Sequence, residues 1–460
     1  MKIRFLGATR VVTGSCYHLS AGETQILVDC GMYQGKNGEE TNRKPFAFDP
    51  REIDFLLLTH AHLDHSGLLP KLAMEGFRGR IIATSGTADL VEIMLYDSAH
   101  IQEKDAEWAT KKSFRAGKDE IVEPLYTEED VKRVVGLIEK ANYGVLGELA
   151  EGIKYRFVDA GHILGSSSLE IWYPGPGREK KIVFSGDVGK KENLIINDPQ
   201  PVKEADYVVV ESTYGNRLHK GIKESIDELA GAISETLRRK GNVLIPAFAV
   251  GRTQDILYIL NRLVREKRLP HLDVYVDSPL ADKATQIYLR HPEYFDPEAV
   301  DMFKAKGSDG MRLHFTKTVE ESQALNKIKS GAIIIAGSGM CEGGRIRHHF
   351  KHNLWRPECS IIFTGFQVKG TLGRFIVDGA RTVRVLGEEI VLRAKVYTIG
   401  GFSAHADQKE LLEWLSYFTQ EPEVFIVHGE EAVSLEFEAV VRQKLGLKTY
   451  APHRGEELEI

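Results

Sequence analysis

The feature that most constrains this chain is a cluster of metal-binding side chains placed directly after a short apolar segment. Residues 55–58 are apolar and favour β-structure, which predicts a buried strand. His60, His62, Asp64 and His65 follow at once. Four such polar groups beside a buried strand would be costly without a cation to neutralise them. Because they would crowd a single ion, we expect the first two histidines to bind one divalent metal ion and Asp64 with His65 to bind a second.

Two later strand ends carry the same kinds of side chain. A β-forming segment around residues 157–158 leads to His162, which lies close to glycines that let an imidazole approach a site. The apolar residues 182–184 lead to Asp187. Taken alone, each residue could equally be a metal ligand or a solvated side chain at a strand end.

Length and composition indicate a soluble globular protein of more than one domain. A chain of 460 residues is too long for one ordinary hydrophobic core, so we expect two packed domains. Its 42% hydrophobic and 27% charged residues are typical of globular proteins. The first residues lead straight into a strand without a secretory signal, and no uncharged apolar run is long enough to span a bilayer. We therefore expect a cytoplasmic protein that does not contact a membrane.

Charge and cysteine content argue against two further classes. The formal net charge of −6 disfavours a protein that coats nucleic acid by bulk electrostatics, although a local basic cleft is compatible with it. The four cysteines are far apart and show no C-x-x-C spacing; they are Cys16, Cys30, Cys341 and Cys359. This pattern indicates buried free thiols rather than a zinc knuckle or a disulfide framework.

The pattern of the chain changes in its middle part. Apolar residues repeat at helical spacing over residues 222–237, and a β-forming segment follows at 243–245. The same alternation of helix and strand continues afterwards, which predicts a parallel α/β sheet. We expect residues 212–390 to form a Rossmann-like insertion, with residues 1–211 and 391–460 forming the two parts of the domain that contains it.

The segment Thr-His-Ala-His-Leu-Asp-His at residues 59–65 resembles the signature of the metallo-β-lactamase superfamily, and later segments resemble its β-CASP nuclease branch. The positions that match these motifs are Asp29, His162, Asp187, Glu211, His405 and His428. The resemblance implies an α/β protein, namely a metallo-β-lactamase αββα sandwich with an inserted Rossmann-like β-CASP domain. The chain is similar in particular to the endonuclease subunit of the cleavage and polyadenylation specificity factor and its bacterial and archaeal relatives.

The resemblance also implies how the site is divided between two zinc ions. One ion takes three histidines, which are His60, His62 and His162. The other takes Asp64, His65 and His428, and Asp187 bridges the two ions. Asp29 would support the metal loop without binding metal, although from the residues alone it could equally be a turn aspartate before Gly31. Imidazole and carboxylate donors favour zinc, with manganese as an alternative.

The reaction that the resemblance implies is hydrolysis of RNA phosphodiester bonds by a two-metal mechanism. Asp64 and Asp187 would serve catalysis through the metals, and His405 would be the general acid, oriented and kept protonated by Glu211. Attack by water would leave 5′-phosphate and 3′-hydroxyl ends. The expected partner is single-stranded RNA, cut within the strand, and 5′–3′ exonuclease activity and a homodimer are both compatible with the sequence.

Two segments of the insertion are candidates for binding the RNA backbone. Arg252 lies in a segment that resembles a recurrent β-CASP sequence, and it could hold a phosphate or simply cap and pair within its own domain. The second segment is a loop after a buried strand, and its candidate residues are Ser338, Gly339, Gly343, Gly344 and Arg345. A strand, a glycine-rich loop and a helix start together form a generic anion cradle. The alternative is a tight packing turn followed by a solvated basic helix face.

Two other functions compete with the ribonuclease prediction. One is a small-molecule metallo-hydrolase of the same fold, against which the insertion and the pair of Glu211 and His405 argue. The other is a non-catalytic RNA-binding scaffold of a processing complex. Inactive relatives of that kind lose metal ligands, whereas this chain retains each of them.

Overall fold

The computed structural model describes residues 1–35, 37–295, 299, 310–365, 367–368 and 370–460. The chain divides into two compact units. The first unit comprises Met1–Asn193, Asn197–Leu218 and His405–Ile460, and the second comprises Leu194–Ile196 and His219–Ala404. The first unit is therefore discontinuous in sequence.

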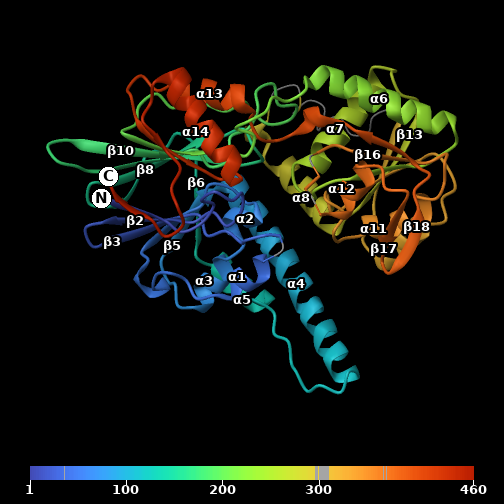
Figure 1. Ribbon diagram of the computed structural model, residues 1–460, viewed down its shortest axis with the longest axis horizontal. Coiled ribbons are helices and arrows are strands. Elements are labelled where there is room, and N and C mark those ends of the chain that lie inside the picture. The colour runs from blue at the N-terminus through green and yellow to red at the C-terminus, as the bar shows by residue number, and fades with distance from the viewer. Residues whose placement is uncertain (36, 296–298, 300–309, 366, 369) are drawn as a thin grey trace. The chain divides into compact units, whose positions relative to one another are not determined.

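The first unit contains two seven-stranded sheets (Figure 1). The first sheet has the order β22-β1-β2-β3-β4-β5-β6. Its strands are β1 (Lys2–Phe5), β2 (Tyr17–Ala21), β3 (Thr24–Val28), β4 (Phe55–Leu57), β5 (Arg80–Thr84), β6 (Ile138–Ala141) and β22 (Glu457–Glu459). The pairs β1–β2 and β2–β3 are antiparallel, whereas β3, β4, β5 and β6 run parallel. Parallel pairing brings the carboxyl ends of β4 and β5 to the same edge of the sheet.

The second sheet has the order β21-β20-β11-β10-β9-β8-β7. Its strands are β7 (Gly147–Ala150), β8 (Ile153–Asp159), β9 (Ser167–Pro174), β10 (Glu179–Phe184), β11 (Tyr207–Glu211), β20 (Glu423–Val427) and β21 (Thr449–Tyr450). β10, β11 and β20 are parallel neighbours, so their carboxyl ends also meet at one edge. The ends of these strands carry the polar motifs noted in the sequence.

The two sheets pack face to face over an apolar core. Phe5 of the first sheet belongs to the same buried cluster as Phe157, Phe184 and Phe425 of the second sheet. Helices α13 (Gln408–Ser416) and α14 (Glu431–Leu445) cover the outer face of the second sheet, and their buried side chains share a cluster with those of β11. The helices beside the first sheet are α1 (Gly38–Arg43), α2 (Leu63–Ser66), α3 (Leu69–Met74), α4 (Ser85–Arg115) and α5 (Glu128–Val135). This arrangement confirms the predicted αββα sandwich.

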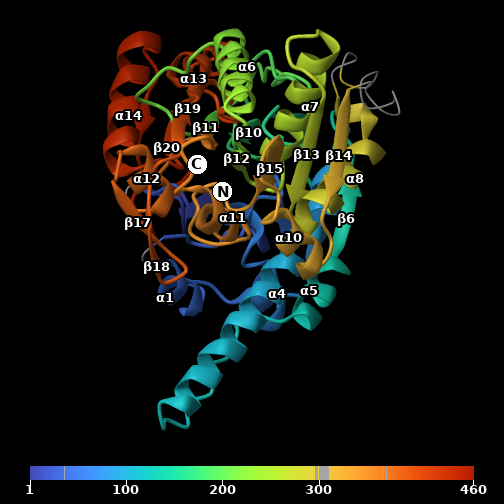
Figure 2. The ribbon, with the colours of Figure 1, turned by 90° about the vertical axis from the view of Figure 1, so that its right-hand side faces the viewer.

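The second unit contains a six-stranded sheet in which each neighbouring pair is parallel (Figure 2). In sheet order its strands are β14 (Met311–Phe315), β13 (Leu272–Asp277), β15 (Ala332–Ala336), β12 (Val243–Pro246), β16 (Ser360–Phe363) and β19 (Lys395–Thr398). The helices among these strands are α6 (Ile222–Arg238), α7 (Arg252–Arg265), α8 (Pro279–Arg290), α10 (Val319–Leu325), α11 (Ile346–Asn353) and α12 (Leu372–Val377). A hairpin of β17 (Thr382–Val385) and β18 (Glu388–Val391) completes the unit. The predicted parallel α/β insertion is thus present.

The second unit ends later than the predicted boundary at residue 390. β19 pairs with β16 and therefore belongs to the parallel sheet, which carries this compact unit to Ala404. The unit also begins at His219 rather than at residue 212. The boundaries at residues 211 and 390 for the functional domains stay a prediction.

Helix α4 is the longest helix among the described residues, with 31 residues. Thr84 caps its start, because its side chain accepts a hydrogen bond from the backbone N–H of Thr87. Charged residues are spread along the whole sequence of this helix. None of the described helices has an apolar stretch long enough to cross a membrane.

Candidate metal centre and active site

The polar motifs of the sequence come together within the first unit, at the carboxyl ends of its strands. The cluster after β4 supplies His60, His62, Asp64 and His65, and the other contributors are His162 after β8, Asp187 after β10, Glu211 at the end of β11, His405 before α13 and His428 after β20. The last residues of β4, β10, β11 and β20, which precede these polar groups, are buried. The sequence order of the motifs therefore corresponds to one site in space.

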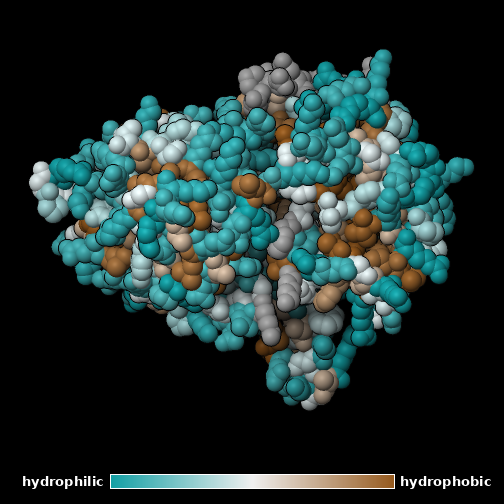
Figure 3. All heavy atoms as spheres, turned by 45° about the horizontal axis from the view of Figure 1, so that its top comes forward, coloured by the Kyte–Doolittle hydropathy of each residue, from teal (hydrophilic) through white to brown (hydrophobic). Residues whose placement is uncertain are grey.

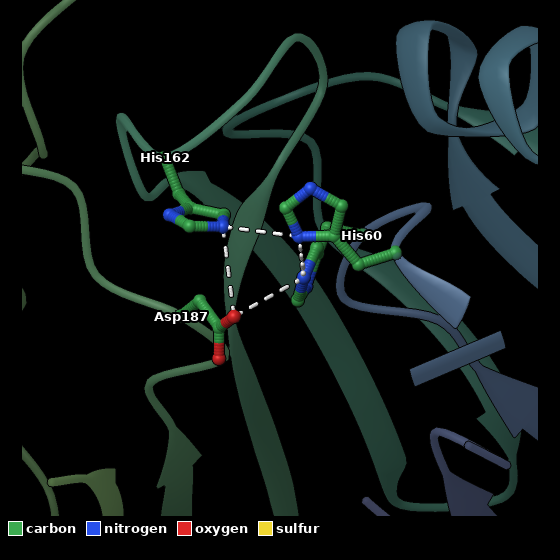
Figure 4. A group of neighbouring side chains, drawn as sticks. His60, His162 and Asp187 are labelled. Atoms are coloured by element: carbon green, nitrogen blue, oxygen red, sulfur yellow. Dashed lines mark hydrogen bonds and ion pairs between the residues drawn. The ribbon is translucent and has the colours of Figure 1, made fainter. Parts of the chain in front are cut away.

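The first ligand set consists of His60, His62, His162 and Asp187. Nε2 of His60 lies 3.2 Å from Nδ1 of His62, and Nε2 of His162 lies 3.2 Å from that same Nδ1 atom. Oδ2 of Asp187 is 3.3 Å from Nε2 of His60 and 3.5 Å from Nε2 of His162. Figure 4 shows the side chains of His60, His162 and Asp187 pointing toward one another. Four ligand atoms tetrahedrally arranged at about 2.0–2.1 Å from a zinc ion are about 3.3 Å apart, which matches these separations.

The second ligand set consists of Asp64, His65 and His428. Nε2 of His428 lies 3.1 Å from Nε2 of His65 and 3.5 Å from Oδ2 of Asp64. The other carboxylate oxygen of Asp187, Oδ1, faces this set at 3.3 Å from His65 and 3.6 Å from His428. Each oxygen of Asp187 therefore faces one of the two sets.

The donor chemistry of the site fits metal ions. Asp187 is 1% exposed, and its buried Oδ1 atom has no hydrogen-bond partner among the described residues. A buried carboxylate oxygen without a partner is costly unless a cation neutralises it. The residues present could therefore hold two ions, one in each ligand set.

Burial keeps the histidines of the first set neutral. It lowers the pKa of His60 and of His162, and it lowers the pKa of His62 to about 3. Burial disfavours the charge on Asp187, but the neighbouring histidines outweigh this effect and hold the pKa of its carboxyl well below the usual range. Neutral imidazoles beside an ionised carboxylate are the protonation states that metal binding requires.

Asp29 organises the loop that carries the ligands. Its Oδ1 accepts a hydrogen bond from the backbone N–H of Thr59 at 2.8 Å, and its Oδ2 accepts one from the Thr59 hydroxyl at 2.8 Å. Oδ2 also lies 2.7 Å from Nδ1 of His65, which leaves Nε2 of that ring directed at the second ligand set. A hydrogen bond of this kind fixes the tautomer and the orientation of a metal-binding histidine.

Close backbone approach also shapes this loop. A Cβ atom on Gly31 would lie 1.7 Å from the backbone oxygen of Asp64, which is far inside van der Waals contact. The backbone N–H of Cys30 donates to the oxygen of His65 at 2.8 Å. Only glycine at position 31 allows the segment after Asp29 to lie this close to the metal loop.

The predicted pair of Glu211 and His405 lies beside the ligands. Both carboxylate oxygens of Glu211 are 3.2 Å from Nδ1 of His405, and the same Nδ1 atom is 3.9 Å from Oδ2 of Asp187. Burial disfavours the imidazolium, but the carboxylate of Glu211 outweighs it and raises the pKa of His405 to about 9. The Glu211 side chain is fully buried, whereas that of His405 is 21% exposed. His405 is thus placed between a buried carboxylate and solvent.

Three supporting residues were not identified from the sequence. Thr59 links Asp29 to the metal loop, Oγ1 of Thr213 lies 3.0 Å from Nδ1 of His428, and Oγ of Ser185 accepts a hydrogen bond from the backbone N–H of Glu211 at 3.0 Å. Each residue lies within two positions of a predicted site residue: Thr59 precedes His60, Ser185 is two residues before Asp187, and Thr213 is two residues after Glu211. Their position beside the motifs is the one signal in the sequence that could have identified these residues. Hydroxyl residues are so common at strand ends that this position alone does not indicate a supporting role.

The predicted RNA-binding residues all lie in the second unit, where several are engaged by their neighbours. Arg252 begins α7, and its Nη1 donates to the backbone oxygen of Thr364. Nη1 of Arg345 is 2.7 Å from Oδ1 of the buried Asp277, so its guanidinium supports the fold of this unit.

The glycine-rich loop between β15 and α11 contains Ser338, Gly339, Gly343 and Gly344. The backbone N–H of Ser338 donates to the oxygen of Gly343 at 3.2 Å, and the N–H of Gly343 lies 3.3 Å from the Ser338 hydroxyl. The ring of Phe248 packs against Gly339, where a Cβ atom would lie 2.9 Å from it. The loop is therefore closed by its own hydrogen bonds, and its binding role stays a prediction.

The fold and the paired ligand sets are those of a hydrolase of the metallo-β-lactamase superfamily. The family pattern described as Metallo-beta-lactamase superfamily matches residues 9–77. The Beta-Casp domain matches residues 253–376, and the Zn-dependent metallo-hydrolase RNA specificity domain matches residues 389–452. The order of these three matches follows the discontinuous first unit and its insertion.

Comparison with known proteins identifies relatives along nearly the whole chain. The chain is 42% identical over 434 residues to Ribonuclease TTHA0252 of Thermus thermophilus, covering 94% of each sequence. It is 32% identical over 462 residues to the RNase J-like protein of Methanocaldococcus jannaschii, covering 100% of this chain and 99% of that protein. It is 33% identical to the Transcription termination factor FttA of Thermococcus kodakarensis, covering 100% of this chain and 71% of that protein.

A solved structure of a protein of unknown function from Enterococcus faecalis is 13% identical, with a TM-score of 0.57 over 99% of both chains, and shows a shared fold alone. Taken with the relatives above, the chain belongs to the β-CASP family of the metallo-β-lactamase superfamily.

Proposed function

We propose that this chain is a zinc-dependent ribonuclease that hydrolyses phosphodiester bonds of single-stranded RNA. The observation that carries the proposal is the division of Asp187 between two ligand sets, beside the pair of Glu211 and His405. RNA as the substrate is supported by the relatives named ribonuclease and by the match to an RNA specificity domain.

Two zinc ions fit the donor set best. Five imidazoles and the carboxylates of Asp64 and Asp187 are the ligands that zinc prefers, with manganese as the alternative. Bound in these sets, the ions would activate a water molecule and offset the charge of the phosphodiester. Asp29 and Thr213 would hold the rings of His65 and His428 in the orientation that binding needs.

The protein's own residues supply the proton for the leaving group. Glu211 accepts the Nδ1–H of His405, which leaves the opposite ring nitrogen, Nε2, to donate its proton to the leaving 3′ oxygen. The attacking water loses one proton to solvent, and its oxygen forms the new bond to phosphorus as the bond to that 3′ oxygen breaks. The products are a 5′-phosphate and a 3′-hydroxyl.

The glycine-rich loop of the second unit is the proposed contact for the RNA backbone. Its candidate residues are Ser338, Gly339, Gly343 and Gly344, and the other candidates are Arg345, which directly follows the loop, and Arg252 at the start of α7. Backbone N–H groups of such a loop can bind phosphate without reading sequence. Both arginines are engaged within the unit, Arg252 with the backbone oxygen of Thr364 and Arg345 with Asp277, and their charge would attract the phosphate.

The test is cleavage of an unstructured, internally labelled RNA by the zinc-loaded protein, alongside the matching DNA. A circular RNA of the same sequence separates cleavage within the strand, which we expect, from 5′–3′ exonuclease activity. Cleavage of RNA that is lost in His405→Ala supports the proposal. Failure to cleave with two zinc ions bound favours a scaffold, and faster turnover of simple esters than of RNA favours a small-molecule hydrolase. A homodimer and a cytoplasmic location stay predictions.

A further inference from the structure

The long helix α4 connects the candidate active site to a distant surface. At its start, the hydroxyls of Thr84 and Thr87 both donate to the backbone oxygen of Gly165, at 2.6 and 2.8 Å, in the loop that carries His162. From there the helix projects out of the first unit (Figure 1). With a rise of about 1.5 Å per residue, Trp108 and Arg115 lie about 35–45 Å along the helix from Ser85.

One face of the projecting part is covered by the chain that follows it. The backbone N–H of Val122 donates to the hydroxyl of Thr110 at 2.9 Å, and the hydroxyl of Ser113 donates to the oxygen of Lys118 at 3.2 Å. The returning segment therefore lies against the helix side that presents Thr110 and Ser113. This contact holds the helix end in place and leaves the side chains on its other side exposed.

The opposite face carries a tryptophan among cations. Helical spacing places four side chains on this face, which we call the basic stripe: Trp108, Lys111, Lys112 and Arg115. Trp108 is 63% exposed, and its three neighbours in the stripe are exposed as well. Nζ of Lys112 lies 5.2 Å from the centre of the Trp108 ring. Figure 3 shows hydrophilic and hydrophobic residues side by side on the end that projects at the lower edge.

The cations of this helix end are grouped together between acidic residues. Residues 108–118 contain Lys111, Lys112, Arg115 and Lys118 and no acidic residue, whereas Glu107 precedes this stretch and Asp119 and Glu120 follow it. Among the residues that the structure describes, no ion pair is recorded for Lys112, Arg115 or Lys118. Lys111 approaches only Glu107, at 4.0 Å. Lys112, Arg115 and Lys118 therefore pair with no carboxylate of the described residues, and they are available to an anionic partner.

We propose that the basic stripe is a second RNA-binding site, which holds single-stranded RNA away from the bond that is cleaved. Cations follow the phosphates of a strand, and an exposed indole offers a face on which a base can stack, so their combination suits single-stranded RNA. A membrane-binding helix would need a wider apolar face than one tryptophan gives. The use of this site in cleavage rests on the proposed ribonuclease function, whereas its affinity for RNA does not.

The separation of the two sites makes binding depend on the length of the RNA. At about 3.4 Å per stacked nucleotide, the 35–45 Å along α4 corresponds to about 10–13 nucleotides. A stacked RNA of six nucleotides spans about 20 Å, which is less than this separation, whereas a stacked RNA of 40 nucleotides exceeds it. The stripe should therefore raise the affinity for long RNA and leave the cleavage of short RNA unchanged.

The test compares two variants of the full chain with a matched control. The stripe variant combines Lys111→Gln, Lys112→Gln and Arg115→Gln, and a second variant is Trp108→Ala. The control combines Lys132→Gln, Lys203→Gln and Lys444→Gln, which remove the same charge from other exposed positions of the first unit. Binding of a fluorescent 40-nucleotide RNA is measured by anisotropy across a salt series, in a His405→Ala background that preserves the RNA.

We expect the stripe variant to lose about tenfold or more in affinity and its salt slope to fall by about 2, because each phosphate contact contributes about 0.7. Trp108→Ala should lose about tenfold, and the control should bind as the parent does. With His405 present, the stripe variant should cleave six-nucleotide RNA at the parent rate.

Equal affinity of all four proteins for the long RNA would overturn the proposal, as would loss of binding to anionic lipid vesicles with RNA binding unchanged. Absence of cleavage by every form, with the affinity differences intact, would reject the proposed function and leave this site standing.

Discussion

Replacement of Asp29 by asparagine should weaken zinc binding while the protein stays folded. Asp29 is 1% exposed and accepts three hydrogen bonds, two from Thr59 and one from Nδ1 of His65. Asparagine can keep an oxygen toward the backbone N–H of Thr59, but its amide group then faces the Nδ1–H of His65, where two donors oppose each other. One charge-assisted hydrogen bond is lost, which costs about 1.5–3 kcal/mol.

Because His65 must hold its ring in one orientation to bind metal, this loss should appear in the second ligand set. It corresponds to about a 10–100-fold decrease in zinc affinity. The assay is equilibrium competition with a chromogenic chelator, with bound zinc counted by mass spectrometry. The matched control is Asp206→Asn, which changes a partly buried aspartate directly before β11, at the end of that strand opposite to Glu211. Asp206 accepts hydrogen bonds from the backbone N–H of Lys181 and from Arg178. Two zinc ions bound by Asp29→Asn with the parent's affinity would refute this reasoning.

Further predictions concern the acid, its pH dependence, the core and the metals. His405→Ala should lower kcat for RNA by about 10²–10⁴ with little change in KM, as measured by single-turnover cleavage. Glu211 raises the pKa of His405 to about 9, and a general acid works below its pKa, so the cleavage rate should fall as the pH rises through about 9. Glu211→Gln should shift this fall in the pH–rate profile toward lower pH. Trp414→Ala should destabilise the first unit by about 3–5 kcal/mol in denaturant unfolding, since Trp414 is 3% exposed in the helix layer. Removal of zinc by a chelator should lower Tm, and zinc should restore it, because ions that bind only the folded state stabilise it.

The layered fold and the ligand cluster could be predicted from local patterns. The apolar segment before His60 and the alternation in the middle of the chain are short-range signals of strand and helix, and both correspond to observed elements. Strand ends that carry histidine or carboxylate are also visible in the sequence. The convergence of His60, His162 and His428 depends on sheet order, which the resemblance to the β-CASP family supplied.

The parts that could not be predicted depend on long-range contacts. The partner of Arg345 is Asp277, which lies on another strand and shows no local sign of the pairing. The pairing of β19 with β16, which joins β19 to the parallel sheet, is a register that no short segment specifies. Thr213 supports His428 from a loop more than 200 residues earlier in the chain, at a separation that sequence patterns do not reveal.

The measurement that tests the central claim most directly is cleavage of a defined RNA in water enriched in ¹⁸O, with the products analysed by mass spectrometry. Attack by water at phosphorus, with proton donation from His405, predicts one ¹⁸O atom in the new 5′-phosphate and a 3′-hydroxyl on the other fragment. A 2′,3′-cyclic phosphate, or a phosphate left on the 3′ side, would contradict the account.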